Sequence, residues 1–418
     1  MVLINKDIDL SRFVAIGDSV TSGYRDGALF YKGQLDSFPR LMAEQFKTKQ
    51  KAEKQDPEDF EFRQPLMHPG SPGLGFWGNS RLVLKKRDDG AGSELSYLAP
   101  AGDLQALATN IYSSQGPFHN LGVPGAKVTT LAAPGYGDPA KGMGNYNPFF
   151  FRMSSDPVKA SILSDALRMR PTFFSLFIGN NDALAYALSG GTSDSITPLA
   201  DFKAGLELVI DALLSAGARG ALSNLPGLES IPFFTSIPYN GLLLDRENRD
   251  QLNLQFPGTV FVQGLNSFLV EDPFHPGGKR QLEKGELVIL DVLLDENRYS
   301  YLQGLIPIPE KYYLSKEQVE QVRKAIAAFN EIIKALAIQK QLAFIDTELF
   351  LRNIATARVY DPRTLCIEYA SGDVFSLDGL HINSLGHSLL ANEFIVAINK
   401  SYNAGIPKIN ITRFREHN

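Results

Sequence analysis

The stretch FVAIGDSVTSG at residues 13–23 determines which class of fold the sequence predicts. Its first four residues are apolar and Gly17 ends the run, which is typical of a short buried strand. Ser19 follows almost at once, so a hydroxyl side chain stands at the carboxyl end of that strand. The stretch TFFSLFI at 172–178 has the same apolar character, and it ends on the polar tetrapeptide GNND at 179–182.

Predicted helices alternate with predicted strands along the rest of the chain. The clearest helix begins at Ser315, which forms a capping box with Gln318 and precedes apolar residues spaced three and four apart. Other helices are expected at 37–50 with Ser37 as N-cap, at 201–217, and at 385–401 with Ser384 as N-cap, and other strands at 219–225 and 342–346. This alternation predicts an α/β fold with a doubly wound parallel sheet.

Composition excludes several classes of protein. The formal net charge of the 418 residues is −5, so no broad basic surface for nucleic acid is expected. Cys366 is the single cysteine, which excludes an intrachain disulfide, and no run of about 20 apolar residues could span a bilayer. The N-terminus lacks the pattern of a signal peptide, so the sequence leaves open a cytosolic protein or an exported one whose leader is absent. The oligomeric state also stays open.

Two long stretches, at about 51–117 and 227–314, interrupt the alternating pattern. They are weakly periodic, and the first contains a Pro/Gly-rich loop and a charged segment. We predict that both are insertions with some β structure in one domain spanning residues 1–418. We further predict that they form a cap over the site.

Three polar clusters, at 18–19, 179–182 and 378–381, are predicted to follow strands or lie in loops at one edge of the sheet. In open parallel sheets, ligands bind at the carboxyl ends of the strands. For any one cluster, ordinary turn chemistry is the better explanation, since Gly, Asn and Asp are common at strand ends. Three clusters that carry Ser, Asn, Asp and His together favour a functional site.

The residue types in these clusters fit nucleophilic catalysis. A serine hydroxyl becomes a nucleophile when a base takes its proton, and the base is normally a histidine oriented by a carboxylate. Asp378 and His381 stand three apart in DGLH, so the carboxylate can reach Nδ1 while Nε2 faces Ser19. The oxyanion would be held by the backbone N–H of Ser19, the backbone N–H of Gly125 and the side-chain amide of Asn181.

These residues fall in four short blocks, GDSVTSG (17–23), NLGVPGA (120–126), GNND (179–182) and SLDGLHIN (376–383). Together the blocks resemble those of the SGNH (GDSL-type) serine hydrolases, a family of lipolytic esterases. Val20 stands where leucine is usual. Ile382 stands where proline is usual, and this second difference concerns loop shape and not the reacting atoms. The resemblance implies a three-layer α/β/α fold with a five-stranded parallel, flavodoxin-like sheet.

The resemblance also assigns roles. It implies that Ser19 is the nucleophile, that Asp378 and His381 complete a catalytic triad, and that Gly125 and Asn181 belong to the oxyanion hole. We expect two further carboxylates, Asp18 and Asp182, to support the loops by hydrogen bonds. The segments SNLPGLESIPFF at 223–234 and DGALFYKGQLDSFP at 26–39 resemble larger members from Bacteroidetes, which are often lipoproteins.

The function predicted from these blocks is hydrolysis of carboxylic esters through an acyl-serine intermediate, with no metal or organic cofactor. The expected substrate is a small-molecule ester of a lipid, another acyl group or an acetylated carbohydrate. The alternative is a catalytically inactive domain that binds glycan or lipid. A binuclear metallophosphoesterase is excluded because Thr21 and Asn181 stand where that class needs Asp and His ligands. The G-x-S-x-G elbow of α/β-hydrolases is absent around Ser19.

Overall fold

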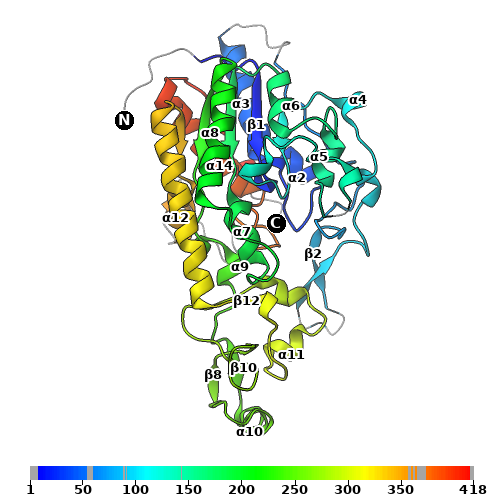
Figure 1. Cartoon of the computed structure of the whole chain (residues 1–418), viewed down its shortest axis with the longest axis vertical. Coiled ribbons are helices and arrows are strands. Elements are labelled where there is room, and N and C mark those ends of the chain that lie inside the picture. Colours follow the sequence, from blue (N-terminus) through cyan, green and yellow to red (C-terminus); the bar gives the residue numbers. More distant parts are fainter. Residues whose placement is uncertain are drawn as a thin grey trace.

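A five-stranded sheet forms the centre of the molecule (Figure 1). Its strand order is β13-β6-β5-β1-β4, and every neighbouring pair is parallel. The strands are β1 (Phe13–Gly17), β4 (Asn120–Gly122), β5 (Phe173–Phe177), β6 (Arg219–Ser223) and β13 (Ala343–Ile345). The predicted α/β fold with a five-stranded parallel sheet is therefore confirmed. The computed structural model describes residues 8–53, 60–87, 90, 92–142, 144–355, 359–360, 363–364 and 373–414, and Cys366 lies outside them.

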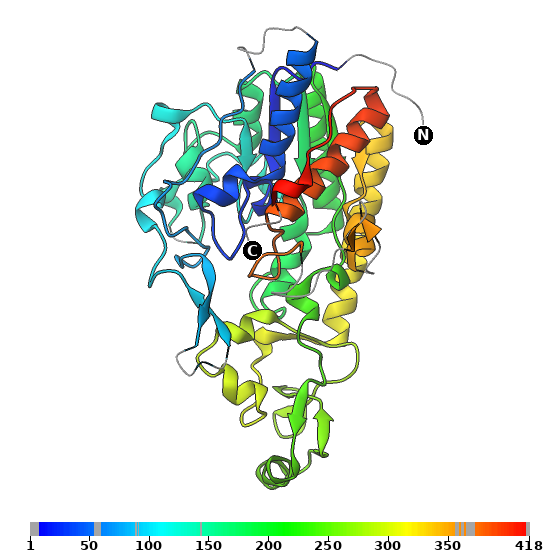
Figure 2. The ribbon, with the colours of Figure 1, turned by 180° about the vertical axis from the view of Figure 1, so that it is seen from behind.

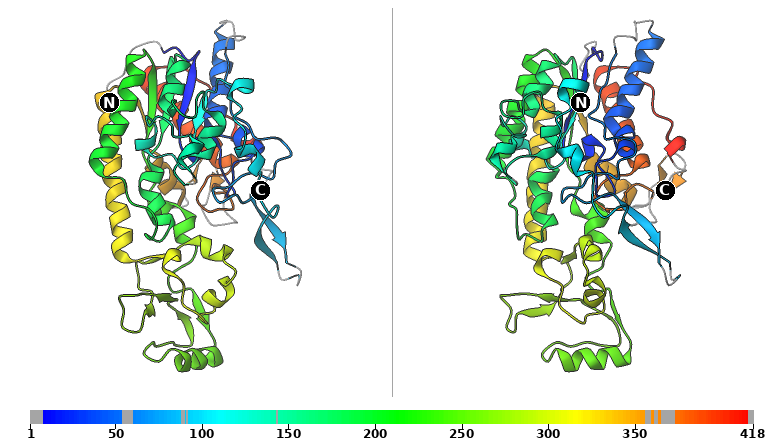
Figure 3. Two further views of the ribbon diagram at one scale, coloured as in Figure 1. Left: turned by 45° about the vertical axis from the view of Figure 1, so that its right-hand side comes forward. Right: turned by 90° about the vertical axis from the view of Figure 1, so that its right-hand side faces the viewer.

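Helices cover both faces of this sheet, giving three layers (Figures 2 and 3). Helices α3 (Phe38–Ala52) and α14 (Ser384–Tyr402) pack together on one face. Helices α8 (Leu199–Ser215) and α12 (Lys316–Gln339) pack together on the other. The remaining helices are α1 (Ser19–Ser22), α2 (Tyr31–Leu35), α4 (Tyr112–Gln115), α5 (Pro148–Met153), α6 (Ile162–Arg168), α7 (Asn180–Leu188), α9 (Pro232–Thr235), α10 (Arg246–Gln255), α11 (Arg298–Leu302) and α13 (Thr347–Ala355).

Local sequence explains the best-defined helix. In α12 the Ser315 hydroxyl accepts from the backbone N–H of Gln318 at 3.3 Å, and the Gln318 side chain accepts from the Ser315 N–H at 2.8 Å. The apolar residues at spacings of three and four are buried, as their period requires. The predicted capping box and the amphipathic face are both confirmed.

One predicted cap is wrong. Helix α14 is capped by Asn383, whose side-chain oxygen accepts from the Gly386 N–H at 3.0 Å. Ser384 is the first helical residue instead, and its hydroxyl donates to Asp36 at 2.5 Å. Asn and Ser are both favoured at N-cap positions, so local preference alone does not decide between these two adjacent residues.

Both predicted insertions contain β structure. The first carries the hairpin of β2 (Leu82–Lys86) and β3 (Ser93–Tyr97), and the second extends as an arm beyond the carboxyl edge of the sheet (Figures 1 and 3). The arm has a hydrophobic cluster of its own. Its short strands are β7 (Leu242–Leu244), β8 (Gly264–Asn266), β9 (Leu269–Glu271), β10 (Lys279–Gln281), β11 (Leu287–Val288) and β12 (Tyr313–Leu314), while β14 (Val359–Tyr360) and β15 (Arg363–Thr364) lie later in the chain.

The two insertions contact each other. Arg298 of the arm pairs with Glu94 of the hairpin at 3.5 Å, and the Arg87 guanidinium donates to the Tyr299 hydroxyl at 3.3 Å. That they act as a cap, within one domain of 1–418, stays a prediction. Among the described residues, none of the helices has the length and apolar character of a membrane span.

Candidate active site

Ser19 is held at the carboxyl end of β1 by a tight strand-to-helix turn. Asp18 caps α1, since its side chain accepts from the Val20 N–H at 3.1 Å. Gly17 must lack a side chain, because a Cβ there would lie 2.1 Å from the Thr21 hydroxyl and 2.3 Å from the Phe177 carbonyl oxygen. A side chain at position 17 would therefore clash with the turn after β1 and with the end of β5.

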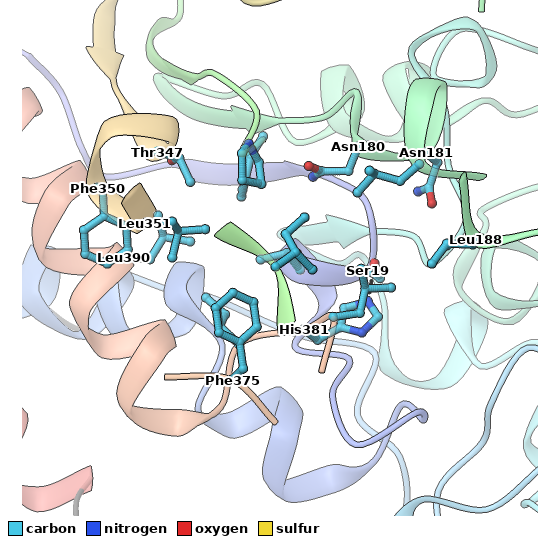
Figure 4. Close-up of a pocket in the computed structure, with 17 residues that line it drawn as sticks. Ser19, Asn180, Asn181, Leu188, Thr347, Phe350, Leu351, Phe375, His381 and Leu390 are labelled. Atoms are coloured by element: carbon cyan, nitrogen blue, oxygen red, sulfur yellow. Dashed lines mark hydrogen bonds between the residues drawn. The ribbon is translucent and has the colours of Figure 1, made fainter. Parts of the chain in front are cut away.

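Three side chains from opposite ends of the sequence form a hydrogen-bonded row. The Nε2 atom of His381 lies 2.9 Å from the Ser19 hydroxyl oxygen, and Nδ1 lies 2.8 Å from Oδ2 of Asp378. Ser19 and His381 are buried, at 8% and 6% exposure. Figure 4 shows the Ser19 hydroxyl beside the His381 ring. The structure thus brings together all three residues that the sequence singled out as a triad.

The Asp378 carboxylate is surrounded by donors. Its Oδ1 accepts from the Ser376 hydroxyl at 3.0 Å, from the Leu380 N–H at 2.9 Å and from the His381 N–H at 2.8 Å. Its Oδ2 accepts from the Gly27 N–H at 2.8 Å in addition to the imidazole. Burial acts to raise the pKa of Asp378, but the charge of His381 and these hydrogen bonds outweigh it and lower the pKa to about 2.

This arrangement fixes the tautomer of the imidazole. An ionised carboxylate only accepts hydrogen bonds, so the Nδ1–H of His381 must donate to Asp378. Nε2 is then the unprotonated nitrogen, and it accepts from the Ser19 hydroxyl. The histidine is therefore poised to take the serine proton.

Asn181 lies beside the loop that contains Gly125. It stands in the first turn of α7, and its Nδ2 donates to the carbonyl of Ala126 at 2.9 Å. Gly125 has a φ of +79°, and a Cβ there would lie 2.8 Å from the Phe76 ring. Both features explain why this position is glycine. Asn181 lines the same cavity as Ser19 and His381, whereas Gly125 is outside the lining of that cavity.

Asp18 and Asp182 tie neighbouring segments together. Asp18 accepts from the Asn180 amide at 2.9 Å, which links the turn after β1 to the start of α7. Asp182 accepts from the Val128 N–H at 2.9 Å, which links α7 to the segment after β4. Burial raises the pKa of each carboxyl to about 6, against the hydrogen bonds that lower it.

Sequence reasoning missed several neighbours of the triad. The Tyr24 ring packs against the imidazole of His381, with 4.8 Å between ring centroids. Phe76 of the first insertion in turn packs on Tyr24 at 5.6 Å, while Trp77 is 95% exposed. Gly27 was missed as a donor to Asp378. Tyr24 and Gly27 both stand within eight residues of Ser19, and proximity in sequence was the only signal that could have found them.

A cavity opens to solvent beside Ser19. Figure 4 shows Ser19, His381 and Asn181 at one end. Phe350, Leu351 and Leu390 lie at the other end, so the lining away from the triad is apolar. Within the ranges that the structure describes, no group of three or more His, Cys, Asp or Glu residues is arranged to hold a metal ion.

Comparison with known families agrees with the blocks in the sequence. The model of the GDSL-like lipase/acylhydrolase family matches residues 13–394. The chain belongs to this family. Family membership supports ester hydrolysis as the general chemistry of this GDSL-like protein.

Solved structures similar to this GDSL-like protein were also found. A putative GDSL-like lipase from Parabacteroides merdae is 11% identical, with a TM-score of 0.37, covering 96% of this chain and 100% of the other. A mutant of Axe2, an acetyl-xylooligosaccharide esterase from Geobacillus, is 11% identical, with a TM-score of 0.38, covering 98% and 99%. A catalytic mutant of Axe2, an acetylxylan esterase from Geobacillus stearothermophilus, has a TM-score of 0.36. No curated protein sequence matches the chain.

Proposed function

We propose that this protein hydrolyses carboxylic esters through an acyl-serine intermediate. The observation that carries the proposal is the unbroken row from the Ser19 hydroxyl through the His381 imidazole to the Asp378 carboxylate, at 2.9 and 2.8 Å. These distances lie within the hydrogen-bond reach that a nucleophile and its base require. Membership of the GDSL-like family supports the same chemistry.

In the first half-reaction, the Ser19 oxygen attacks the ester carbonyl carbon and its proton moves to Nε2 of His381. The ionised Asp378 stabilises the imidazolium that forms. His381 then gives the proton to the departing alkoxide, so the alcohol leaves and the acyl group stays on Ser19. In the second half-reaction, water attacks the acyl carbon, His381 takes the proton of that water, and the free acid leaves as the proton returns to Ser19.

The negative charge of each tetrahedral intermediate needs hydrogen-bond donors. We assign these to the backbone N–H of Ser19, the backbone N–H of Gly125 and the Asn181 amide. Support comes from the bond between Asn181 and Ala126, which holds the carboxamide next to the loop of Gly125. Asp18 and Asp182 support the loops, since each links two segments of the site. No residue in this scheme requires a metal or an organic cofactor.

The test is covalent labelling combined with turnover. We expect a fluorophosphonate probe to modify Ser19 in the wild-type protein, as peptide mass spectrometry would show, and the protein to hydrolyse p-nitrophenyl acetate. Ser19→Ala should lose both properties, while Ser215→Ala, an exposed serine on α8, should keep both. A folded wild-type protein that neither reacts with the probe nor turns over the ester would contradict the proposal and favour the alternative, an inactive domain that binds glycan or lipid.

A further inference from the structure

A tight turn at residues 25–28 lies against the catalytic loop, residues 376–381. The first and fourth residues of the turn donate their N–H groups to each other's carbonyl, at 3.2 and 3.0 Å. The two central residues, Asp26 and Gly27, have φ angles of +52° and +71°. Both angles are positive, as in a type I′ turn, for which Asp-Gly is a preferred pair. These two residues therefore fix the shape of the turn.

Three hydrogen bonds join the central residues of the turn to the catalytic loop. The Asp26 N–H donates to the Ser376 hydroxyl oxygen at 2.9 Å, and the Gly27 N–H donates to Oδ2 of Asp378 at 2.8 Å. In the opposite direction, the Leu377 N–H donates to Oδ1 of Asp26 at 3.0 Å. The Ser376 hydroxyl in turn donates to Oδ1 of Asp378 at 3.0 Å. Both oxygens of Asp378 are thus linked to the turn, one directly and one through Ser376.

The first insertion holds the other side of the turn. The Leu82 N–H donates to the Asp26 carbonyl at 2.7 Å, and the Asn79 amide donates to the Gly27 carbonyl at 3.1 Å. The Tyr24 hydroxyl also donates to the Gly27 carbonyl, at 2.6 Å. The central N–H groups of the turn therefore bond to the catalytic loop, while its central carbonyls bond to the first insertion and to Tyr24.

The second carboxylate oxygen of Asp26 faces a buried arginine. Nε of Arg25 lies 3.8 Å from Oδ2 of Asp26, and Nη2 of Arg25 lies 3.6 Å from Oδ2 of Asp36. Arg25 also donates to the Ser384 hydroxyl at the start of α14. These contacts restrain the Asp26 carboxylate, so Oδ1 stays within reach of the Leu377 N–H.

We propose that the turn at 25–28 positions Asp378 for catalysis, and that Asp26 is a positioning residue which acts through the catalytic loop. The proposal rests on the proposed function, because it takes His381 as the base and Asp378 as its partner. By holding Leu377, Asp26 keeps the loop where Asp378 meets Nδ1 of His381. A misplacement of about 1 Å can cost about 10²-fold in rate, so disturbing the turn should lower kcat.

The first experiment compares Asp26→Gly with Asp26→Asn by steady-state kinetics on p-nitrophenyl acetate. Glycine and asparagine both tolerate a positive φ, so both variants should keep the turn. Only asparagine keeps a side-chain oxygen for the Leu377 N–H. Asp26→Gly should therefore lower kcat by about 10- to 100-fold with KM within about twofold, and Asp26→Asn should come within about threefold of the wild-type kcat.

The matched control is Gln341→Gly. Gln341 has a φ of +54°, close to that of Asp26, but it precedes β13 and so lies at the amino end of that strand, away from the site. This variant should keep the kcat of the wild type.

A second pair of variants tests the turn without altering Asp26. Gly27→Val places a β-branched residue at a φ of +71°, so the backbone should shift and withdraw its N–H from Asp378. Gly27→Asn tolerates that angle, and a Cβ there has room, since the nearest atom, on Leu82, would lie 3.5 Å away. Divided by the fraction of protein that a fluorophosphonate labels at completion, kcat should fall at least tenfold in Gly27→Val and at most threefold in Gly27→Asn.

A spectroscopic readout separates positioning from stability. The low-field proton resonance of the His381 Nδ1–H reports its bond to Asp378, and it should shift or broaden in Asp26→Gly and Gly27→Val but persist in the two asparagine variants. A kcat within threefold of wild type in both Asp26→Gly and Gly27→Val would overturn the inference and leave the proposed function standing. Equal losses in Asp26→Gly and Asp26→Asn would also contradict it. If the wild-type protein neither turns over the ester nor takes up the probe, the proposed function itself fails.

Discussion

Replacing Asp378 by asparagine would test whether its negative charge, rather than its shape, orients the catalytic base. Both oxygens of Asp378 accept hydrogen bonds only, from Ser376, Gly27, Leu380 and two N–H groups of His381. Asparagine has nearly the same size, but one of its two terminal groups is a donor.

The loss of kcat expected for Asp378→Asn follows from these contacts. Since Oδ1 has three donors and Oδ2 has two, the NH₂ of the introduced asparagine would take the place of Oδ2, facing the Gly27 N–H and Nδ1 of His381. The imidazole would then turn to the tautomer with its proton on Nε2, which cannot accept the proton of Ser19. The same change in other triads costs about 10⁴ in kcat, or about 5.5 kcal/mol of activation free energy.

The same substitution should also destabilise the fold. The pKa of Asp378 is lowered from 3.8 to about 2, so the folded state binds its proton more weakly than the unfolded state does. The carboxylate therefore contributes about 2.5 kcal/mol at neutral pH, and the wild-type protein loses this as the pH falls from about 4 to 2. Asp378→Asn should lose a similar amount at pH 7.

The assay is kcat on p-nitrophenyl acetate together with urea unfolding at pH 7. The control is Asp201→Asn, an exposed carboxylate on α8, which should change neither quantity appreciably. A folded Asp378→Asn protein with kcat within tenfold of wild type would refute the reasoning, because the base would then work without a charged partner.

Two further predictions concern the residues around the triad. Asn181→Ala should lower kcat by about 10²–10³ with little change in KM, as expected for a donor that acts in the transition state, and steady-state kinetics would show whether KM rises instead. Burial raises the pKa of Asp182 to about 6, so the folded state holds the proton of this carboxyl more tightly than the unfolded state does. The free energy of unfolding should therefore fall as the pH rises from about 4 to 6. Asp182→Asn keeps an acceptor for the Val128 N–H but cannot titrate, so the loss of unfolding free energy with pH should be smaller by up to about 3 kcal/mol. A variant whose Tm varies with pH as the wild type does between pH 4 and 7 would contradict this.

Much of the site was predictable because its functional side chains lie in short blocks of sequence. The apolar run before Gly17 predicts β1, and the spacing of Asp378 and His381 predicts a carboxylate within reach of the imidazole. The capping box at Ser315 predicts the start of α12. Each of these depends on residues within a few positions of one another, where backbone geometry limits the possible arrangements.

Other features depend on partners that local patterns do not reveal. The Ser384 hydroxyl donates to Asp36, which lies 348 positions earlier in the chain. The Tyr24 ring beside His381 and the ion pair between Arg298 and Glu94 likewise join segments far apart in sequence. Predicting them requires the order of the strands and the packing of the helices.

The sequence by itself determined the class of fold and the residues that can carry out the chemistry, because strand periodicity and reactive side chains are local properties. Only the tertiary structure decided the shape of the cavity, whose walls come from the ends of four strands and from helices α7, α13 and α14. The physical reason is that apolar residues follow the same sequence pattern along a helix or strand whether they pack in the core or line a cavity. The strand order β13-β6-β5-β1-β4 sets which of these residues face the space beside Ser19.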